Sequence, residues 1–338
     1  MIEINKAKQK IVVGVDIGGT NTAVGIIDFN KNFIFEDSFL TEPEEGIEKF
    51  VNRLAKQIKV IYSKYSSTYI LEGIGIAAPG ANYLTGILES PANLKWGNVP
   101  MIDMMKEYFE IPIILINDAQ AAALGEMEFG CAKEMKNFLV LTLGTGFGSG
   151  IVINGQLLYG ENGHAGEIGH TIVEKKGRQC NCGNKGCLET YVSATGIKRT
   201  VLDFLHRYKD ESELRNIESK NISAKLISQL ALQHDSIALR AFDYTGKILG
   251  IALANMVTYF DPQAIILTGG LVEADGLLLK PAREYFKKSL LGIYNGRVQI
   301  LKSSVQNNLA GLLGACSYIL KNINNNQEHP VLCAEFAK

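Results

Sequence analysis

The chain has 338 residues, of which 46% are hydrophobic, with 34 glycines and only 8 prolines. This length fits two lobes of about 100–200 residues each, and the composition is that of a globular α/β protein. The net charge is −1, so the chain has no overall basic field of the kind that attracts DNA or RNA. We therefore expect no nucleic-acid partner.

No apolar run reaches the ~18 residues of a membrane span, and the first ten residues hold neither an apolar signal segment nor a cleavage site. These features predict a cytoplasmic protein with no membrane partner. Three of the six cysteines (Cys180, Cys182 and Cys187) lie close together. In a reducing compartment such crowding favours a metal site over disulfide bonds.

The first half of the chain combines β-branched runs with two helical segments. Gly18, Gly19 and Thr20 separate the first two runs, which predicts a tight hairpin. The expected strands are 11–17, 22–28, 33–38, 70–78 and 111–116, and the expected helices are 44–65 and 101–109.

The second half repeats the opening pattern, since 138–155 again reads as strand, glycine turn and strand. Duplication of one unit is the simplest interpretation. A buried strand is expected at 264–268, and helices at 245–260, 276–290 and 309–320. The sequence thus predicts an α/β fold of two similar lobes with a cleft between them.

Two glycine turns are candidates for phosphate binding. In Asp16-Ile17-Gly18-Gly19-Thr20 a carboxylate ends a strand, and the glycines then let backbone N–H groups approach an anion and its Mg²⁺. Such a turn could also simply close a hairpin. Gly144-Thr145-Gly146 occupies the matching place in the repeat, which favours phosphate, whereas no Walker or dinucleotide motif is present.

Asp118 is the candidate general base. It follows the apolar run 113–116 and Asn117, at the carboxyl end of an expected strand, where α/β folds bind ligands. It could equally be a helix N-cap. Phosphoryl transfer needs one group that accepts the proton of the attacking hydroxyl, and Asp118 can do so while Asn117 orients the alcohol.

The segment 163–189 combines GHAGEIGH with CNCGNKGCLE. Three cysteines and one histidine form a closed Cys₃His set suited to structural zinc, although unligated thiols are the alternative; His164 is the weaker histidine candidate. The metal would fix the loop that carries Glu167 and Glu189. Those two carboxylates are suited to accept hydrogen bonds from vicinal sugar hydroxyls.

Taken together, DIGGTNT at 16–22, Asn117-Asp118, LGTGFGSGIVINGQL at 143–157, GHAGEIGH and the cysteine run resemble the ROK family of sugar kinases and repressors. This family lies within the actin-like, ribonuclease-H-like ATPase superfamily, and the resemblance covers about residues 10–322. It implies an ATP- and Mg²⁺-dependent hexose kinase, a homodimer or homotetramer, with structural Zn²⁺ and with Asp118 as catalytic base.

The resemblance also implies which residues meet each ligand. The sugar contacts would be Gly80, Asn93, Asn117, Asp118, Glu167, His170 and Glu189. The nucleotide contacts would be Asp16, Gly18, Gly19, Thr20, Asn21, Thr145, Gly146, Gly269 and Gly270. The zinc ligands would be His170, Cys180, Cys182 and Cys187.

The implied domains are a small one at 1–117, a large one at 118–304 with the zinc loop, a helix at 305–322 that packs back on the first, and a polar tail at 323–338. Glucose is the expected substrate, ahead of N-acetylmannosamine, N-acetylglucosamine, fructose and allose, and some relatives use polyphosphate. Three rivals are a sugar-sensing repressor, a chaperone or filament ATPase, and an inactive sugar-binding protein. The short segment before the first strand argues against a repressor, and the zinc cluster argues against a chaperone or filament ATPase. The intact Asp118 argues against an inactive sugar-binding protein.

Overall fold

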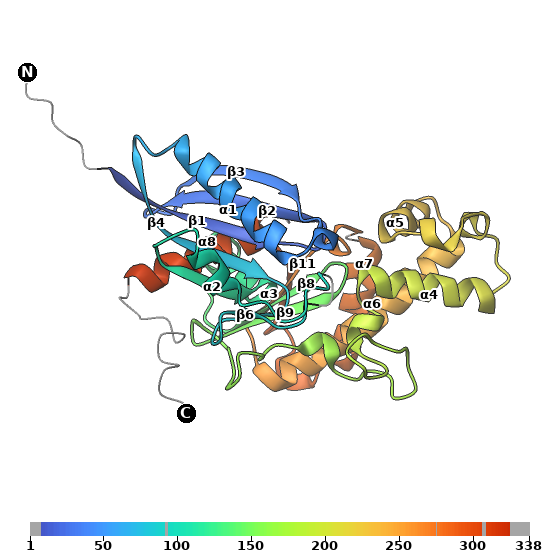
Figure 1. Ribbon diagram of the computed structural model, residues 1–338. Coiled ribbons are helices and arrows are strands. Elements are labelled where there is room, and N and C mark those ends of the chain that lie inside the picture. The colour runs from blue at the N-terminus through green and yellow to red at the C-terminus, as the bar shows by residue number, and fades with distance from the viewer. Residues whose placement is uncertain (1–7, 92–93, 275, 306–308, 325–338) are drawn as a thin grey trace, which may run out of the picture. The chain divides into compact units, whose positions relative to one another are not determined.

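The computed structural model describes residues 8–91, 94–274, 276–305 and 309–324. Its contacts divide the chain into two compact units (Figure 1). Unit 1 comprises Met1–Lys133, Tyr159–His164 and Asn308–Lys338, and unit 2 comprises Glu134–Leu158 and Ala165–Asn307. Among the described residues, no helix combines the length and the apolar character that crossing a bilayer requires.

Unit 1 is built on a five-stranded mixed sheet in the order β3-β2-β1-β4-β7. The first three strands are antiparallel, as a hairpin meander requires, and β4 and β7 run parallel to β1. The sheet strands are β1 (Gln9–Ile17), β2 (Asn21–Asp28), β3 (Phe33–Leu40), β4 (Tyr69–Ala78) and β7 (Ile113–Asn117). A small ribbon, β5 (Ala81–Asn82) and β6 (Ile87–Leu88), and the helices α1 (Ile47–Ser63), α2 (Met101–Lys106), α3 (Asp118–Glu128) and α8 (Ala310–Asn324) complete the unit.

The two faces of the unit 1 sheet are covered for different reasons. Alternate apolar residues of β1, such as Val13 and Val15, pack with the apolar stripe of α1, where Phe50 and Leu54 are fully buried. The opposite face is rich in glycine, and α8 lies against it (Figure 1). A Cβ on Gly75 would stand 2.1 Å from a backbone oxygen of α8, so only glycine permits this close approach.

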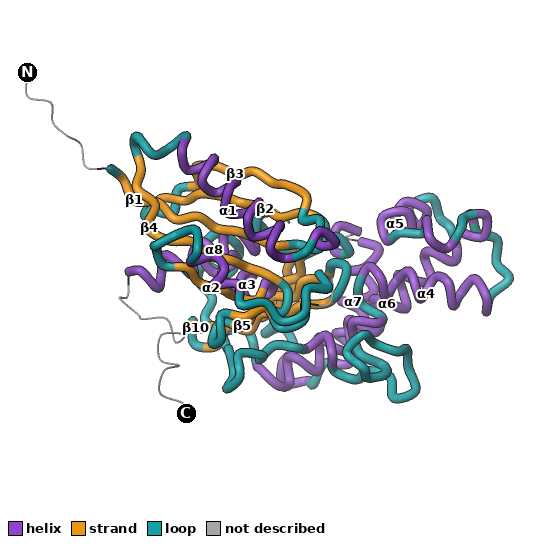
Figure 2. Tube along the Cα trace, in the orientation of Figure 1, coloured by secondary structure: helices purple, strands orange, loops and turns teal. Residues whose placement is uncertain are grey.

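Unit 2 repeats the same plan, with a sheet in the order β10-β9-β8-β11-β12. Its first three strands are antiparallel, and β11 and β12 are parallel to β8. The strands are β8 (Phe138–Leu143), β9 (Phe147–Ile153), β10 (Gln156–Leu157), β11 (Ala264–Thr268) and β12 (Gln299–Lys302). The helices are α4 (Ala194–Arg207), α5 (Ala224–Leu232), α6 (Ser236–Phe260) and α7 (Gly276–Ser289), and Figure 2 shows that α4, α5 and α6 are neighbours.

The shared strand order confirms the prediction of an α/β fold built from two similar units. The expected strands and helices are present, with shifted ends, and the pattern at 245–260 is the second half of the longer α6. The compact units differ from the expected domain boundary after Asn117, because α3 packs on α8 and so belongs to unit 1. Helix α8 also packs on β1 and β4.

Candidate active site

The turn between β1 and β2 is an exposed glycine turn that a buried threonine supports from behind. Gly18 N–H donates to Asn21 O at 2.9 Å, and the Thr41 hydroxyl donates to Gly18 O at 2.7 Å. A Cβ on Gly18 would stand 2.8 Å from Asn21 O, which explains the glycine. Gly19, Thr20 and Asn21 are exposed at the tip and free to meet a ligand. Thr41 carries no sequence motif and was not among the expected site residues.

Asp16 precedes this turn and faces α8. A Cβ on Gly311 of α8 would stand 2.4 Å from Asp16 Oδ2, so glycine makes room for the carboxyl group. Desolvation, with a smaller contribution from the charge of Asp118, raises the pKa of Asp16 from 3.8 to about 7. The two carboxyl groups therefore share one electrostatic environment within unit 1, which suits a site that receives a divalent cation.

The end of β7 places Asn117 and Asp118 at the carboxyl edge of the sheet, as expected. Asn117, not Asp118, is the N-cap of α3: its Oδ1 accepts from Ala119 N at 2.9 Å and from Gln120 N at 3.3 Å. Asp118 is the first helical residue, and its Oδ1 also accepts from Ala119 N at 2.9 Å. Asn117, and not Asp118, therefore caps the helix. The Nδ2 amide group of Asn117 takes no part in the cap and can donate to a ligand.

The β5–β6 ribbon forms a second polar part of unit 1. Buried Asn82 donates to Glu89 Oε1 at 2.9 Å and to Asn162 O at 3.0 Å. His164 Nε2 lies 3.1 Å from Glu89 Oε2, so His164 is a loop contact and not part of the cysteine cluster. Gly80 lies at the start of the ribbon, at a φ of 66° that favours glycine, and its carbonyl accepts from Glu89 N. Asn93 lies outside the described residues.

In unit 2 the second glycine turn joins β8 to β9 and carries Thr145 and Gly146. Glu189 closes it from one side, because its Oε2 accepts from Phe147 N at 2.9 Å. A Cβ on Gly146 would stand 2.5 Å from the same oxygen. Glu189 is therefore bound to the glycine turn through one carboxylate oxygen, a contact that sequence reasoning missed.

Gly269 and Gly270 follow β11 and adjoin this turn. Gly269 has a φ of 98°, and a Cβ there would lie 2.6 Å from Leu143 O, so the position requires glycine on both counts. Leu271 N donates to the same carbonyl at 3.0 Å. Around Gly270 there is open space. Unit 2 thus places Gly269 and Gly270, expected beside the adenosine, next to the turn that carries Thr145 and Gly146.

The cysteine run and the end of GHAGEIGH form one cluster in unit 2. One ligand atom from each of His170, Cys180, Cys182 and Cys187 lies within 4.8 Å of all the others. His170 Nδ1 is 3.6 Å from Cys180 Sγ, and the Sγ atoms of Cys182 and Cys187 are also 3.6 Å apart. Donors about 2.3 Å from a central tetrahedral ion lie roughly 3.8 Å from one another, so the geometry fits a metal and not a disulfide.

The environment of the thiols points the same way. Burial raises the pKa of the Cys187 thiol to about 12, whereas a backbone hydrogen bond involving Asn184 lowers that of Cys182. These closely spaced thiols, of which Cys180 and Cys187 are buried, would repel one another as thiolates unless a cation is present among them. His170 Nε2 also lies 3.8 Å from Glu167 Oε2, so the histidine connects the cluster to one of the expected sugar contacts.

Comparison with known proteins agrees with these features. The ROK family model matches residues 12–322. A glucokinase from Halalkalibacterium halodurans is 36% identical over 321 residues, covering 94% of this chain and 96% of the relative. A ROK family glucokinase from Streptomyces griseus, solved with glucose and AMPPNP, superposes with a TM-score of 0.76 at 30% identity, covering 91% of this chain and 98% of that one.

A xylose repressor from Bacillus spizizenii is 28% identical over 329 residues, covering 95% of this chain and 79% of the repressor. The chain therefore belongs to the ROK family, as its motifs indicated. Its fold is the two-lobed, actin-like fold of the ROK sugar kinases.

Proposed function

We propose that the chain is an ATP-dependent hexose kinase that converts glucose to glucose 6-phosphate. The observation that carries this proposal is the position of Asp118 at the carboxyl end of β7. There its charge is close enough to Asp16, beside the first glycine turn, to help raise the pKa of Asp16. Full-length similarity to glucokinases and to a glucokinase solved with glucose and AMPPNP supports both substrates. A sugar sensor or a filament protein has no need of a base at this place.

Asp118 accepts the proton of the sugar hydroxyl as the oxygen forms its bond to the γ-phosphorus and the bond from phosphorus to the β–γ bridging oxygen breaks, releasing ADP. Oε2 of Glu189 already accepts from Phe147 N, so Oε1 is the more accessible acceptor for a sugar hydroxyl. We assign the sugar contacts to Gly80, Asn93, Asn117, Asp118, Glu167, His170 and Glu189. We assign the nucleotide contacts to Asp16, Gly18, Gly19, Thr20, Asn21, Thr145, Gly146, Gly269 and Gly270.

Two metals fit the residues present. Asp16 would hold the Mg²⁺ that accompanies the triphosphate, directly or through water, and the ion would neutralise charge on the phosphates. His170, Cys180, Cys182 and Cys187 would hold a structural zinc, which leaves no open position for water. A thiolate site also fits a reducing compartment, and we propose that the enzyme acts in the cytoplasm.

A coupled assay of ADP release tests the reaction class. Glucose, N-acetylmannosamine, N-acetylglucosamine, fructose and allose are each offered with ATP, and glucose is offered again with polyphosphate. Glucose with ATP should give the highest kcat/KM. Binding of a sugar without ADP release from any of the five would refute the kinase proposal and favour the sugar-sensing role found elsewhere in the family.

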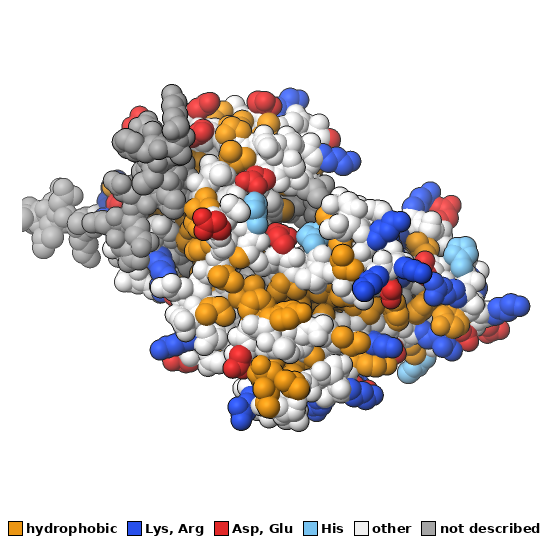
Figure 3. Space-filling view, turned by 90° about the horizontal axis from the view of Figure 1, so that it is seen from below, with side chains coloured by type: hydrophobic (Ala, Val, Ile, Leu, Met, Phe, Trp, Pro, Cys, Tyr) orange, Lys and Arg blue, Asp and Glu red, His pale blue; other side chains and the backbone are white. Residues whose placement is uncertain are grey.

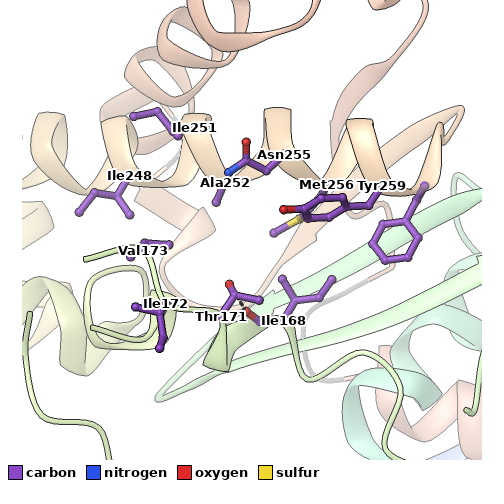
Figure 4. Close-up of a pocket in the computed structure, with 11 residues that line it drawn as sticks. Ile168, Thr171, Ile172, Val173, Ile248, Ile251, Ala252, Asn255, Met256 and Tyr259 are labelled. Atoms are coloured by element: carbon purple, nitrogen blue, oxygen red, sulfur yellow. Dashed lines mark hydrogen bonds between the residues drawn. The ribbon is translucent and has the colours of Figure 1, made fainter. Parts of the chain in front are cut away.

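We further propose that the enzyme is a homodimer or homotetramer, and that one face of unit 2 forms the contact. A groove of about 380 Å³ runs between α6 and residues 168–173 (Figure 4). Apolar side chains dominate its lining, and several are well exposed, with Tyr259 at 71% and Ile172 at 58%. Hydrophobic side chains also form a band in the space-filling view (Figure 3).

A symmetric dimer needs one patch that supplies both the groove and the side chains that fill it, and this face has both. Sedimentation velocity on the wild type and on Tyr259→Glu tests the proposal, with Tyr208→Glu, an exposed tyrosine outside the groove, as the matched control. The Tyr259 variant alone should shift to a smaller assembly, a monomer from a dimer or a dimer from a tetramer. An unchanged assembly of that variant would exclude this face as the contact.

A further inference from the structure

The β8–β9 turn is bound on one side to the first residues of α4. Ala194 N donates to Gly144 O at 2.8 Å, and the Thr195 hydroxyl donates to Thr145 O at 3.0 Å. Ser193 caps α4 by accepting from Gly196 N at 2.9 Å, and its hydroxyl also donates to Glu189 O at 2.8 Å. Two consecutive carbonyl groups of the turn therefore point towards the start of this helix.

These carbonyl contacts determine where the neighbouring N–H groups point. In a trans peptide the C=O of one residue and the N–H of the next lie in one plane and point in opposite directions. Both peptides are trans. Because Gly144 O and Thr145 O face α4, the N–H groups of Thr145 and Gly146 face away from it, side by side. Consecutive N–H groups with this common direction form an anion-binding concavity.

A third hydrogen bond connects the β8–β9 turn to a residue that is expected to bind sugar. Phe147 N donates to Glu189 Oε2, and Glu189 lies in η3 (Leu188–Thr190), directly after the cluster residue Cys187. The turn is thus held at its beginning and middle by α4 and at its end by the segment expected to meet sugar. All of these residues belong to unit 2.

We infer that Thr195 is a positioning residue of the kinase: its hydroxyl holds the Thr145 carbonyl so that the N–H groups of the turn point at the phosphates of ATP. The inference rests on the proposed function, which assigns Thr145 and Gly146 to nucleotide binding. Thr195 is exposed, so its role in the fold is small, and it acts through the orientation of the turn. It supplies no group to the sugar.

Steady-state kinetics of Thr195→Val and Thr195→Ser provide the first test. Valine keeps the branched shape but has no hydroxyl, and serine restores the donor. The valine variant should raise KM for ATP about three- to tenfold, the effect of one lost hydrogen bond, and leave KM for glucose and Tm unchanged. The serine variant should return KM for ATP to within about twofold of wild type. An unchanged KM for ATP, or equal changes in both KM values, would overturn the inference.

Binding of Mg²⁺ with AMPPNP to protein labelled with ¹⁵N-threonine and ¹⁵N-glycine separates the two layers of the proposal. In wild type the amide signals of Thr145 and Gly146 should shift on titration, and in Thr195→Val they should shift with a higher Kd. If they fail to shift in wild type, the assignment of this turn to phosphate is wrong. If they shift with the same Kd in both proteins, only the role of Thr195 is wrong.

Discussion

Replacement of Asp16 by asparagine should stabilise the ligand-free protein, increasingly so as the pH rises. The pKa of this carboxyl group is raised to about 7 in the folded chain, chiefly by desolvation. In the unfolded chain it returns to about 3.9. Between these values the folded state keeps a proton that the unfolded state has lost, so the free energy of unfolding falls as pH rises through this window. Asparagine does not titrate and is free of this penalty.

The size of the effect follows from the two pKa values. One pKa unit corresponds to about 1.4 kcal/mol. About two of the roughly three units between the unfolded and folded pKa values of Asp16 lie between about pH 5 and about pH 7. The stability gained by Asp16→Asn over wild type should therefore grow by about 2–3 kcal/mol between about pH 5 and about pH 8. Asp118 contributes the smaller part of the shift, so Asp118→Asn should reduce the pH dependence without removing it.

Urea unfolding without nucleotide or magnesium measures this difference at both pH values. Asp103→Asn, which changes an exposed carboxyl group on α2, is the matched control and should follow wild type. If the stabilities of wild type and Asp16→Asn keep a constant difference across the pH range, the carboxyl group is not desolvated as described. The raised pKa of Asp16 and its coupling to Asp118 would then be refuted.

Three other substitutions test separate parts of the structure. Gly314→Ala would place a Cβ 1.7 Å from Ala121 O and should lower the free energy of unfolding by about 3 kcal/mol. The control Gly276→Ala, in open space, should not lower it, and equal denaturant midpoints of the two variants would contradict the close α3–α8 packing. Elemental analysis should show that Cys182→Ser loses bound zinc and that the control Cys131→Ser keeps it. Zinc retained by Cys182→Ser at the wild-type level would exclude Cys182 as a ligand. Asn82→Ala should cost about 1–3 kcal/mol, because it removes donors to Glu89 and Asn162, and an unchanged Tm would show that this polar network contributes nothing.

The sequence was most informative where a local pattern has one structural solution. Alternating β-branched residues around Gly18 and Gly144 predicted both hairpins, and the repetition of that pattern predicted two units with one strand order. The spacing of the cysteines predicted a cluster that the structure brings together with His170. The hairpins and the cysteine cluster are each formed by residues that are near one another in the sequence.

The rest depends on contacts between distant segments. Thr41 supports a turn more than twenty positions before it, and Gly311 makes room for Asp16 from the far end of the chain. A single sequence gives no sign of either contact. The contact of Glu189 with Phe147 N was missed for the same reason. The sequence offered an N-cap only as the alternative role of Asp118, because asparagine and aspartate are equally good N-caps; the backbone angles show that Asn117 is the cap.

The proposed role of Asp118 as catalytic base is tested most directly by measuring kcat and sugar affinity in Asp118→Asn. Isothermal titration calorimetry measures the Kd for glucose in the absence of ATP. We predict that kcat falls about 10²- to 10⁴-fold while the Kd for glucose changes less than about threefold. A variant that binds glucose normally and retains wild-type kcat would show that another group accepts the proton.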